Sequence, residues 1–212
     1  MSALSNERIV HVVEDDAAVR RSLERLLDSA GFTPVLYESA VSFLGAAQEV
    51  SAGCVLLDVR MPDMDGLELQ TRLNRLGFAL PIIVMTGHGD VQTAVRAMKA
   101  GAHDFIEKPF DDERLLAAID QALALSGPGS RERETAEALD KIATLSPRER
   151  NVLDGLVAGK PNKVIAYGLG ISVRTVEVHR VRMLRRLGTR STAEAIRVAV
   201  MATLAAHGRP DP

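Results

Sequence analysis

The chain of 212 residues has few of the features that mark secreted or membrane proteins. It contains a single cysteine, Cys54, so no disulfide can form within it. No apolar run reaches the roughly 20 residues that a helix needs to cross a bilayer. The opening segment MSALSNER also lacks the basic and apolar regions of a secretory signal. We therefore expect a soluble, cytosolic protein in which Cys54, flanked by apolar neighbours, is buried and unreactive.

The charge of the chain is small in total but unevenly distributed. The formal net charge is -2. Residues 1–124 hold 11 basic and 19 acidic side chains, a balance of -8, whereas residues 125–212 hold 15 and 9, a balance of +6. An acidic half suits a metal or phosphoryl site and a basic half suits nucleic acid, although charged faces are often only solvated. The length favours two domains.

The first half alternates short apolar runs with segments of helical periodicity. Strands are expected at Ile9–Val13, Pro34–Tyr37, Cys54–Leu57, Pro81–Met85 and Asp104–Ile106. Helices are expected at Ala17–Ala30, Ser39–Ala46, Gly66–Leu76, Asp90–Ala100 and Asp111–Leu125. Strands that alternate with helices imply parallel pairing through right-handed crossovers. We predict an α/β domain with a doubly wound, five-stranded parallel sheet.

The glycines and proline in LSGPGS, residues 125–130, mark a domain boundary. We expect a first domain at residues 1–125, a partly helical linker at 126–143 and an all-α domain at 144–212. In the last part, Ser146-Pro147-Arg148-Glu149 forms a capping box that starts a helix. Further helices are expected at Asn162–Leu169, Ser172–Leu187 and Thr192–Leu204, four in all. The tight turn before Ser172 is typical of a helix-turn-helix.

Polar side chains follow four of the expected strands. They are Glu14 and Asp15 after the first, Asp58 at the end of the third, Thr86 at the end of the fourth and Lys108 after the fifth. The carboxyl ends of parallel strands meet at one edge, so we expect these side chains to lie together. Clustered carboxylates need a cation, and oxygen ligands favour Mg²⁺ or Mn²⁺ over zinc. From this set of side chains we predict that Asp58 attacks phosphorus while Lys108 and Thr86 bind phosphoryl oxygens. Asp16 is interpreted as a helix cap.

The motifs VVEDDAAVR, LLDVRMPDMDG, PIIVMTGHGD and DFIEKPF, in this order and spacing, resemble the receiver domain of bacterial response regulators over residues 7–125. That domain has a flavodoxin-like fold. The resemblance implies that Asp58 is the phosphoacceptor. It also implies a metal site made by Glu14, Asp15, Asp58 and the backbone carbonyl of Arg60. The first acidic position is more often Asp in this family than the Glu found here.

The same resemblance assigns further roles. Thr86 and Phe105 form a switch pair, Lys108 contacts the phosphate, and the Lys108–Pro109 peptide is cis. Phosphorylation is expected to pull Thr86 toward the phosphate and to let Phe105 turn inward. A dimer interface is then expected on the surface made by the helix at residues 90–100 and the strand at 104–106. The helix carries Val91, Val95 and Met98 at helical spacing. We expect at least one of these three to be exposed at rest, although each is also a possible core residue.

The expected helix from Ser172 is basic, with six arginines and one acid between Arg174 and Arg190. Its apolar face is Val176, Met183, Leu184 and Leu187. The segment from Leu145 to Gly188 resembles the LuxR-type helix-turn-helix, over residues 142–206. Its pairing with a receiver resembles the FixJ/NarL class, and the GHGDVQTAVRAMKAGAHDFIEKPF segment resembles the FixJ branch, which regulates nitrogen-fixation genes. The DNA-binding candidates are Lys163, Arg174, Thr175, Glu177, Val178, His179, Arg182 and Arg185.

We predict a phosphorylation-controlled transcriptional regulator, an activator, whose partners are a sensor histidine kinase, promoter DNA and RNA polymerase. We expect a resting monomer whose acidic receiver contacts or occludes the basic half, and a phosphorylated dimer on a pseudo-palindromic operator. Two alternatives stay open. A hydrolase of the acid-phosphatase kind would need a second acid two residues after Asp58, where the chain has Arg60. A protein-interaction module would not bind DNA. We expect no enzyme activity beyond the protein's own phosphorylation and dephosphorylation.

Overall fold

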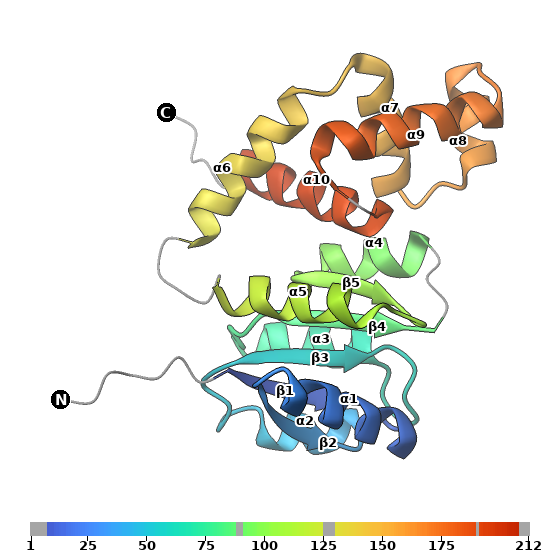
Figure 1. The fold of residues 1–212 in the computed structure, drawn as a ribbon. Coiled ribbons are helices and arrows are strands. Elements are labelled where there is room, and N and C mark those ends of the chain that lie inside the picture. Colours follow the sequence, from blue (N-terminus) through green and yellow to red (C-terminus); the bar gives the residue numbers. More distant parts are fainter. Residues whose placement is uncertain (1–7, 88–90, 125–129, 190, 208–212) are drawn as a thin grey trace. The chain divides into compact units, whose positions relative to one another are not determined.

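The computed structural model describes residues 8–87, 91–124, 130–189 and 191–207 (Figure 1). The chain separates into two compact units, residues 1–89 with 100–127 and residues 90–99 with 128–212. In this division helix α4 (Val91–Lys99) is grouped with the second unit, and the predicted domain boundaries stay predictions. Among the described residues, no helix is both long and apolar enough to cross a membrane.

The first unit contains a five-stranded, all-parallel sheet in the order β2-β1-β3-β4-β5, which confirms the predicted fold (Figure 1). The strands are β1 (Ile9–Val13), β2 (Thr33–Tyr37), β3 (Cys54–Asp58), β4 (Ile82–Thr86) and β5 (Asp104–Glu107). The helices are α1 (Ala17–Ser29), α2 (Ala40–Ala46), α3 (Gly66–Arg75) and α5 (Asp112–Ala124). Most boundaries lie within one residue of the predicted ones, and no predicted strand or helix of this unit is missing.

Burial explains why the strands read as continuous apolar runs. All five residues of β3 and all five of β4 are buried, as expected for parallel strands covered on both faces. On one face, Leu56 and Ile83 share a core with Leu27 of α1 and Ile119 of α5. Cys54 lies in the same core, and burial raises the pKa of its thiol to about 12. The prediction of a buried cysteine is therefore confirmed, and its lack of reactivity stays a prediction. The buried strands hold their carboxyl ends in fixed positions.

The strand order reverses at β1, which pairs with β2 on one side and with β3 on the other. Chain connections leave such a point in opposite directions and open a crevice beyond the strand ends, where ligands of doubly wound sheets bind. In the register between these strands, Val13 lies beside Leu57. Glu14, which follows Val13, and Asp58, which follows Leu57, therefore lie side by side at that crevice.

The second unit is helical in its described part. Besides α4, it contains α6 (Ser130–Ala143), α7 (Pro147–Val157), α8 (Asn162–Leu169), α9 (Val173–Leu187) and α10 (Thr192–His207). The predicted capping box forms at Ser146, and Pro147 occupies the first turn. Gly170 ends α8 in the left-handed conformation with φ 65°, which glycine adopts without strain, and Ser172 caps α9. The predicted helix-turn-helix and its four-helix setting are confirmed.

Helix α6 is more than a spacer. It packs along α10, with Ala138 and Ile142 buried, and Glu134 forms an ion pair with Arg197 of α10. The rest of this core is provided by residues that recur at helical spacing, among them Val152, Leu156, Val176, Met183 and Ile196. The segment predicted as a linker thus contains a helix that is part of the second unit.

Candidate phosphoryl site and DNA-binding surface

The carboxyl end of the sheet holds Asp58 between a lysine and a second carboxylate. Lys108 donates hydrogen bonds from Nζ to Asp58 Oδ1 and to Glu14 Oε2, each at 2.6 Å. The backbone N–H of Arg60 donates to the other oxygen, Asp58 Oδ2, at 2.7 Å. Glu14 is 2% and Asp58 4% exposed. Two buried carboxylates are stabilised here by one shared ammonium group, as buried charges require.

Electrostatics in this pocket follow from burial and pairing. Burial raises the pKa of Glu14 above its usual value, and the hydrogen bond and charge of Lys108 oppose that rise without cancelling it. Burial lowers the pKa of Lys108, but the bonds to Asp58 and Glu14 outweigh this effect and the net pKa is raised. Lys108 therefore stays protonated, and its ammonium group pairs with both carboxylates.

The acidic residues also meet the requirements of a cation site. Ligand oxygens of Glu14, Asp15 and Asp58 all lie within 4.8 Å of one another. The set offers carboxylate oxygens alone, which suits a hard cation such as Mg²⁺ rather than zinc. Asp15 is exposed, so one side of the group is open to solvent. Three of the four predicted ligands are thus brought together, and the part of the Arg60 carbonyl stays a prediction.

Arg20, which the sequence pattern did not single out, holds the loop after β1 together with the predicted cap Asp16. The Arg20 guanidinium donates from Nη1 to the carbonyl oxygens of Glu14 (2.7 Å) and Asp15 (2.9 Å). Asp16 caps α1 by accepting from the backbone N–H of Ala18 and Val19. Those bonds lower the pKa of Asp16, and its interpretation as a cap is confirmed. The VVEDDAAVR motif contains Arg20, but its role depends on the loop conformation, which sequence alone does not show.

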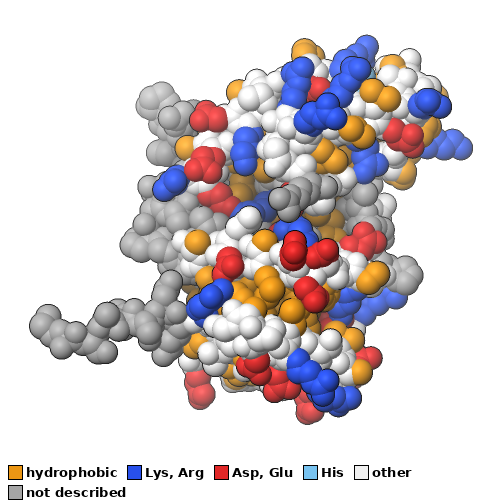
Figure 2. Space-filling view, viewed as in Figure 1, with side chains coloured by type: hydrophobic (Ala, Val, Ile, Leu, Met, Phe, Trp, Pro, Cys, Tyr) orange, Lys and Arg blue, Asp and Glu red, His pale blue; other side chains and the backbone are white. Residues whose placement is uncertain are grey.

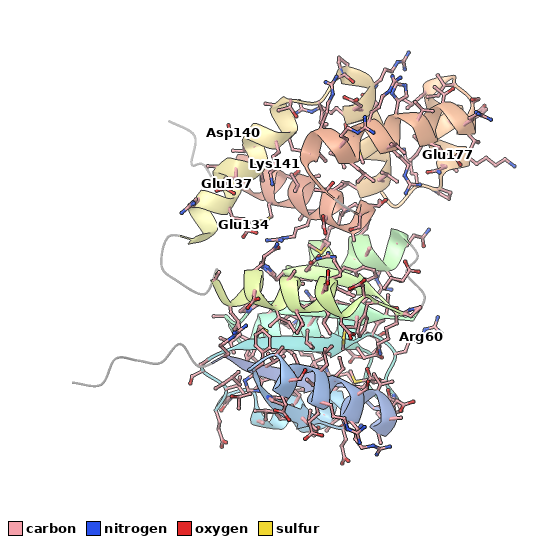
Figure 3. The ribbon with its side chains drawn as sticks, in the orientation of Figure 1. Arg60, Glu134, Glu137, Asp140, Lys141 and Glu177 are labelled. Carbon is pink, nitrogen blue, oxygen red and sulfur yellow. The ribbon has the colours of Figure 1, made fainter. Side chains whose placement is uncertain are left out.

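The loop after β3 needs glycine at its end. A Cβ atom at Gly66 would lie 2.2 Å from the carbonyl oxygen of Asp58 and 3.1 Å from Cα of Val59. The backbone N–H of Gly66 donates to the carbonyl oxygen of Val59 at 2.9 Å, which closes the loop. The exposed side chain of Arg60 extends away from the sheet (Figure 3). The LLDVRMPDMDG motif therefore keeps α3 close to the phosphoacceptor candidate.

The predicted switch pair lies on neighbouring strands, Thr86 at the end of β4 and Phe105 within β5 beside Val84. Thr86 is 1% and Phe105 5% exposed. The backbone N–H of Lys108 donates to the carbonyl oxygen of Thr86 at 2.7 Å, which ties the loop after β5 to the end of β4. The Lys108–Pro109 bond is cis, as predicted. The rotation of Phe105 on phosphorylation stays a prediction.

Two of the three residues of the predicted dimer surface are buried in this conformation, and the interface stays a prediction. Val95 is 5% and Met98 3% exposed. The side chain of Val91 lies outside the described residues, so the expectation of one exposed member rests on Val91 alone. Apolar residues recur at the same spacing on a core face and on an interface. In this conformation the apolar face of α4 is buried at Val95 and Met98.

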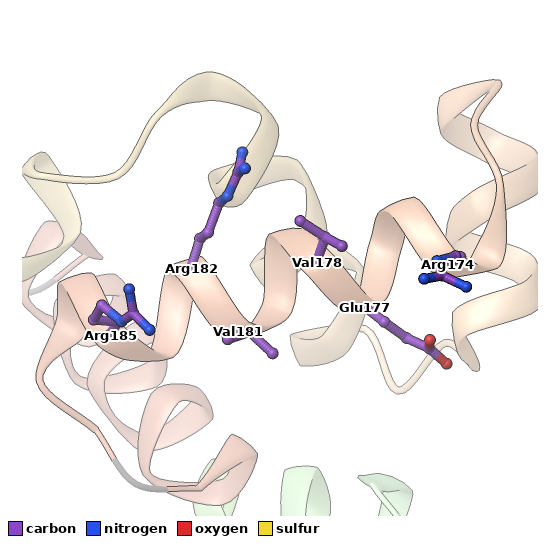
Figure 4. Close-up of a pocket in the computed structure, with 6 residues that line it drawn as sticks. All are labelled: Arg174, Glu177, Val178, Val181, Arg182 and Arg185. Atoms are coloured by element: carbon purple, nitrogen blue, oxygen red, sulfur yellow. The ribbon is translucent and has the colours of Figure 1, made fainter.

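Helix α9 presents a different kind of site, an open stripe on one helix. A shallow groove along it is lined by Arg174, Glu177, Val178, Val181, Arg182 and Arg185 (Figure 4). In the space-filling view, basic and apolar side chains mingle on the part of the second unit where α9 lies (Figure 2). The opposite side of the helix is buried through Val176, Met183 and Leu187. The side chains that line the groove are therefore different from those that pack α9 into the core.

Two arginines of α9, Arg180 and Arg186, act as tethers: they hold the helix in place by hydrogen bonds to neighbouring segments. Helical periodicity does not distinguish them from the other arginines. Arg180 donates to Asn162 Oδ1 (3.1 Å) and Thr192 Oγ1 (2.7 Å), joining α9 to the starts of α8 and α10. Arg186 donates to the carbonyl oxygen of Thr144 at 3.1 Å. Its guanidinium also lies 3.5 Å from the buried carboxylate of Glu149. These bonds orient α9 and leave Arg174, Arg182 and Arg185 for the groove.

The remaining DNA-binding candidates lie at the surface. Lys163 is exposed, and His179 is partly exposed. Thr175 is also partly exposed, and its Oγ1 lies 2.8 Å from Ser172 Oγ at the start of α9. All eight candidates belong to α8 or α9. The structure thus gathers them on the helix-turn-helix, while their contacts with DNA stay predictions.

An aspartate paired with lysine at the crevice of a doubly wound sheet, in a chain that also carries a basic helix-turn-helix, defines the response regulators of two-component systems. Residues 10–120 match the response regulator receiver domain family, and residues 143–199 match the luxR family of bacterial regulatory proteins. The chain belongs to the response regulators that combine these two domains. Membership implies a sensor kinase as partner and DNA as ligand.

Within that class the chain is similar to the transcriptional regulatory protein FixJ. The protein from Bradyrhizobium diazoefficiens is 47% identical over 194 residues, 91% of this chain and 95% of that protein. The one from Azorhizobium caulinodans is 49% identical over 197 residues, 92% and 93%. The crystal structure of full-length FixJ from B. japonicum matches with 47% identity and a TM-score of 0.56, covering 93% of this chain and 98% of that one. The predicted resemblance is confirmed.

Proposed function

We propose that Asp58 accepts a phosphoryl group from a sensor histidine kinase, and that the modification controls binding of the second unit to promoter DNA. The observation that supports this most is the placement of Asp58, a buried carboxylate at the strand-order reversal with Lys108 hydrogen-bonded to it at 2.6 Å. A carboxylate oxygen of Asp58 attacks phosphorus, the bond between phosphorus and the donor nitrogen breaks, and an acyl phosphate forms.

The surrounding residues have separate roles in this proposal. Lys108 is cationic and lies beside the attacking carboxylate, so it stabilises charge on the incoming phosphoryl oxygens. The backbone N–H of Arg60 orients Asp58 through Oδ2. The Thr86 hydroxyl binds a phosphoryl oxygen once the group is attached. Glu14, Asp15 and Asp58 would hold Mg²⁺, whose charge would further neutralise the phosphoryl group.

The proposal extends to regulation. Phosphorylation favours a dimer, which presents two helix-turn-helix units to the half-sites of a pseudo-palindromic operator. The protein then acts with RNA polymerase as an activator, and its similarity to FixJ suggests nitrogen-fixation genes as targets. It turns over no external substrate, and it works in the cytoplasm, where promoter DNA is.

Mass spectrometry of the full-length chain after incubation with acetyl phosphate and Mg²⁺ tests the first step. We expect one added phosphoryl group, which is absent in Asp58→Asn. Asp63→Asn is the matched control, because Asp63 lies five residues away and its positive φ of 66° suits asparagine. A labelled Asp58→Asn protein, or an unlabelled Asp63→Asn protein, would contradict the assignment.

Analytical ultracentrifugation and DNA titration of the same samples test the second step. We expect the phosphorylated protein to be dimeric at micromolar concentration and to bind promoter DNA more tightly than Asp58→Asn does. A monomer with unchanged affinity would refute control by dimerisation and leave the phosphorylation result standing. Steady release of phosphate from added phosphomonoesters would instead support the hydrolase alternative.

A further inference from the structure

We propose that Val178 and Val181 read the methyl groups of thymines in the major groove, so that each half-site of the operator carries two thymines facing α9. The proposal rests on the DNA-binding function proposed above and deepens it by naming the base and the chemistry of its recognition. It follows from an apolar pair placed among arginines on an exposed helix face.

Exposure is the first observation. Val178 is 43% and Val181 59% exposed. Among the described residues, five of the eight large hydrophobic side chains with high exposure lie between residues 164 and 181, in α8 and α9. Single exposed apolar residues are normal on protein surfaces, but a concentration of them on one small motif marks an interaction surface.

Charge identifies the partner that this surface fits. Three arginines, Arg174, Arg182 and Arg185, line the same groove as the valines, and Glu177 is its single acid. An apolar protein partner would have to desolvate these guanidinium groups, which is costly without paired anions. A nucleic acid supplies both requirements, phosphates for the arginines and an apolar group in the groove for the valines.

The chemistry of the bases selects thymine. In the major groove, thymine presents its C5 methyl group, which is recognised by apolar contact, whereas the other base edges present hydrogen-bonding groups. Valine has no donor or acceptor and cannot satisfy those edges. Val178 and Val181 are three residues apart on α9, a rise of about 4.5 Å. Because stacked bases are about 3.4 Å apart along a strand, the two methyl groups belong to adjacent or next-but-one base pairs.

The test removes the methyl groups from the DNA and leaves the wild-type protein intact. Full-length protein treated with acetyl phosphate and Mg²⁺ is used to select duplexes from a randomised pool. Each thymine of the selected site is then replaced by deoxyuridine, and Kd is measured by fluorescence anisotropy. We expect two thymines in each half-site at which loss of the methyl group weakens binding about fourfold, the change that burial of one such group corresponds to.

Variants then connect each methyl group to a side chain. Val178→Ala and Val181→Ala should each abolish the deoxyuridine effect at one thymine and keep it at the other. Val41→Ala is the control, because Val41 is 55% exposed but lies in α2 of the first unit, and it should keep both effects. Equal affinity for the thymine and deoxyuridine duplexes, or unchanged methyl sensitivity in both α9 variants, would overturn methyl readout while DNA binding stands. Failure to enrich any duplex would refute DNA binding itself, and methyl readout with it.

Discussion

The two candidate sites of this protein are built in opposite ways. The phosphoryl site collects buried side chains from the ends of several strands, and its charges are already paired with one another. The surface of α9 arranges exposed side chains along one helix whose other face provides the packing. In the first site, chemistry and folding depend on the same atoms. In the second they are separated, so substitutions there should change recognition and leave stability nearly unchanged.

The largest expected effect tests that dependence in the first site. Gly66→Ala places a Cβ atom 2.2 Å from the carbonyl oxygen of Asp58, a backbone atom that cannot move aside cheaply. We expect a loss of about 3 kcal/mol in the free energy of unfolding of the first unit and slower phosphorylation of Asp58. Differential scanning calorimetry of the full chain measures the first quantity.

The matched control for this substitution is Gly45→Ala. Gly45 lies within α2, and a Cβ atom there would meet nothing within 4 Å. Alanine is the better helix former, so this change should be neutral or slightly stabilising. If both glycine variants behaved alike, the close approach of α3 to Asp58 would not matter for stability.

The next prediction concerns whether α6 contributes to the stability of the helical unit that carries α9. Ile142 of α6 is 9% exposed, whereas Leu139 of the same helix is 44% exposed. We expect Ile142→Ala to lower the unfolding free energy of the second unit by about 2 to 3 kcal/mol, and Leu139→Ala to have less than half that effect. Equal, small effects in the calorimetric transition would mean that α6 is a passive linker and that the helix-turn-helix is stable without it.

A third pair of substitutions compares the two sites directly, because each removes one cation. Lys108→Met leaves the carboxylates of Glu14 and Asp58 buried without their shared partner. The side chain of Lys108 is 21% exposed, so we expect a loss of about 2 kcal/mol rather than the full cost of breaking a buried pair. Added Mg²⁺ should recover more stability in this variant than in the wild type.

Arg182→Ala should behave in the opposite way. It removes an exposed cation from the groove of α9 and should change stability by less than about 0.5 kcal/mol. If Arg182 contacts a phosphate, DNA affinity should fall and the slope of log K against log salt concentration should decrease by about 0.9. A destabilised Arg182→Ala protein with unchanged DNA binding would remove the distinction between the sites.

Sequence reasoning succeeded where geometry follows from periodicity. Parallel strands bring their carboxyl ends together, so the sequence alone predicts that Glu14, Asp58 and Lys108 lie at one edge. It did not show that Lys108 bridges both carboxylates, or that Gly66 must approach Asp58, because these contacts depend on loop conformation. The same limit applied to α9, where Arg180 and Arg186 look like their neighbours in the pattern. Only the positions of Asn162 and Thr144 reveal that they are tethers.

Helix α4 illustrates a second limit. A stripe of apolar residues at helical spacing is equally consistent with a buried face and with an interface. Val95 and Met98 were predicted as interface residues on the strength of a family resemblance, and both are buried. The pattern alone does not distinguish the two, because what covers a helix face depends on packing partners distant in the sequence, so the dimer interface stays a prediction.

The smallest expected effect concerns pH and distinguishes the core of the first unit from its site. His11 is 6% exposed; its Nε2–H donates to the carbonyl oxygen of Ala52 (3.1 Å), and Nδ1 accepts from Tyr37 (3.3 Å). Burial lowers the pKa of His11 below its ordinary 6.5, although the bond to Ala52 opposes the shift. Below pH 6.5 the unfolded chain therefore binds more protons than the folded one, and stability decreases as the pH falls toward the folded pKa.

The substitution His11→Phe tests this effect, because it keeps a ring beside Phe43 but removes the titration. We expect the calorimetric transition of its first unit to decline less between pH 7 and pH 5.5 than that of the wild type, with the second unit as internal reference. Parallel declines in the two proteins would mean that the titration of His11 does not control the acid stability of the first unit.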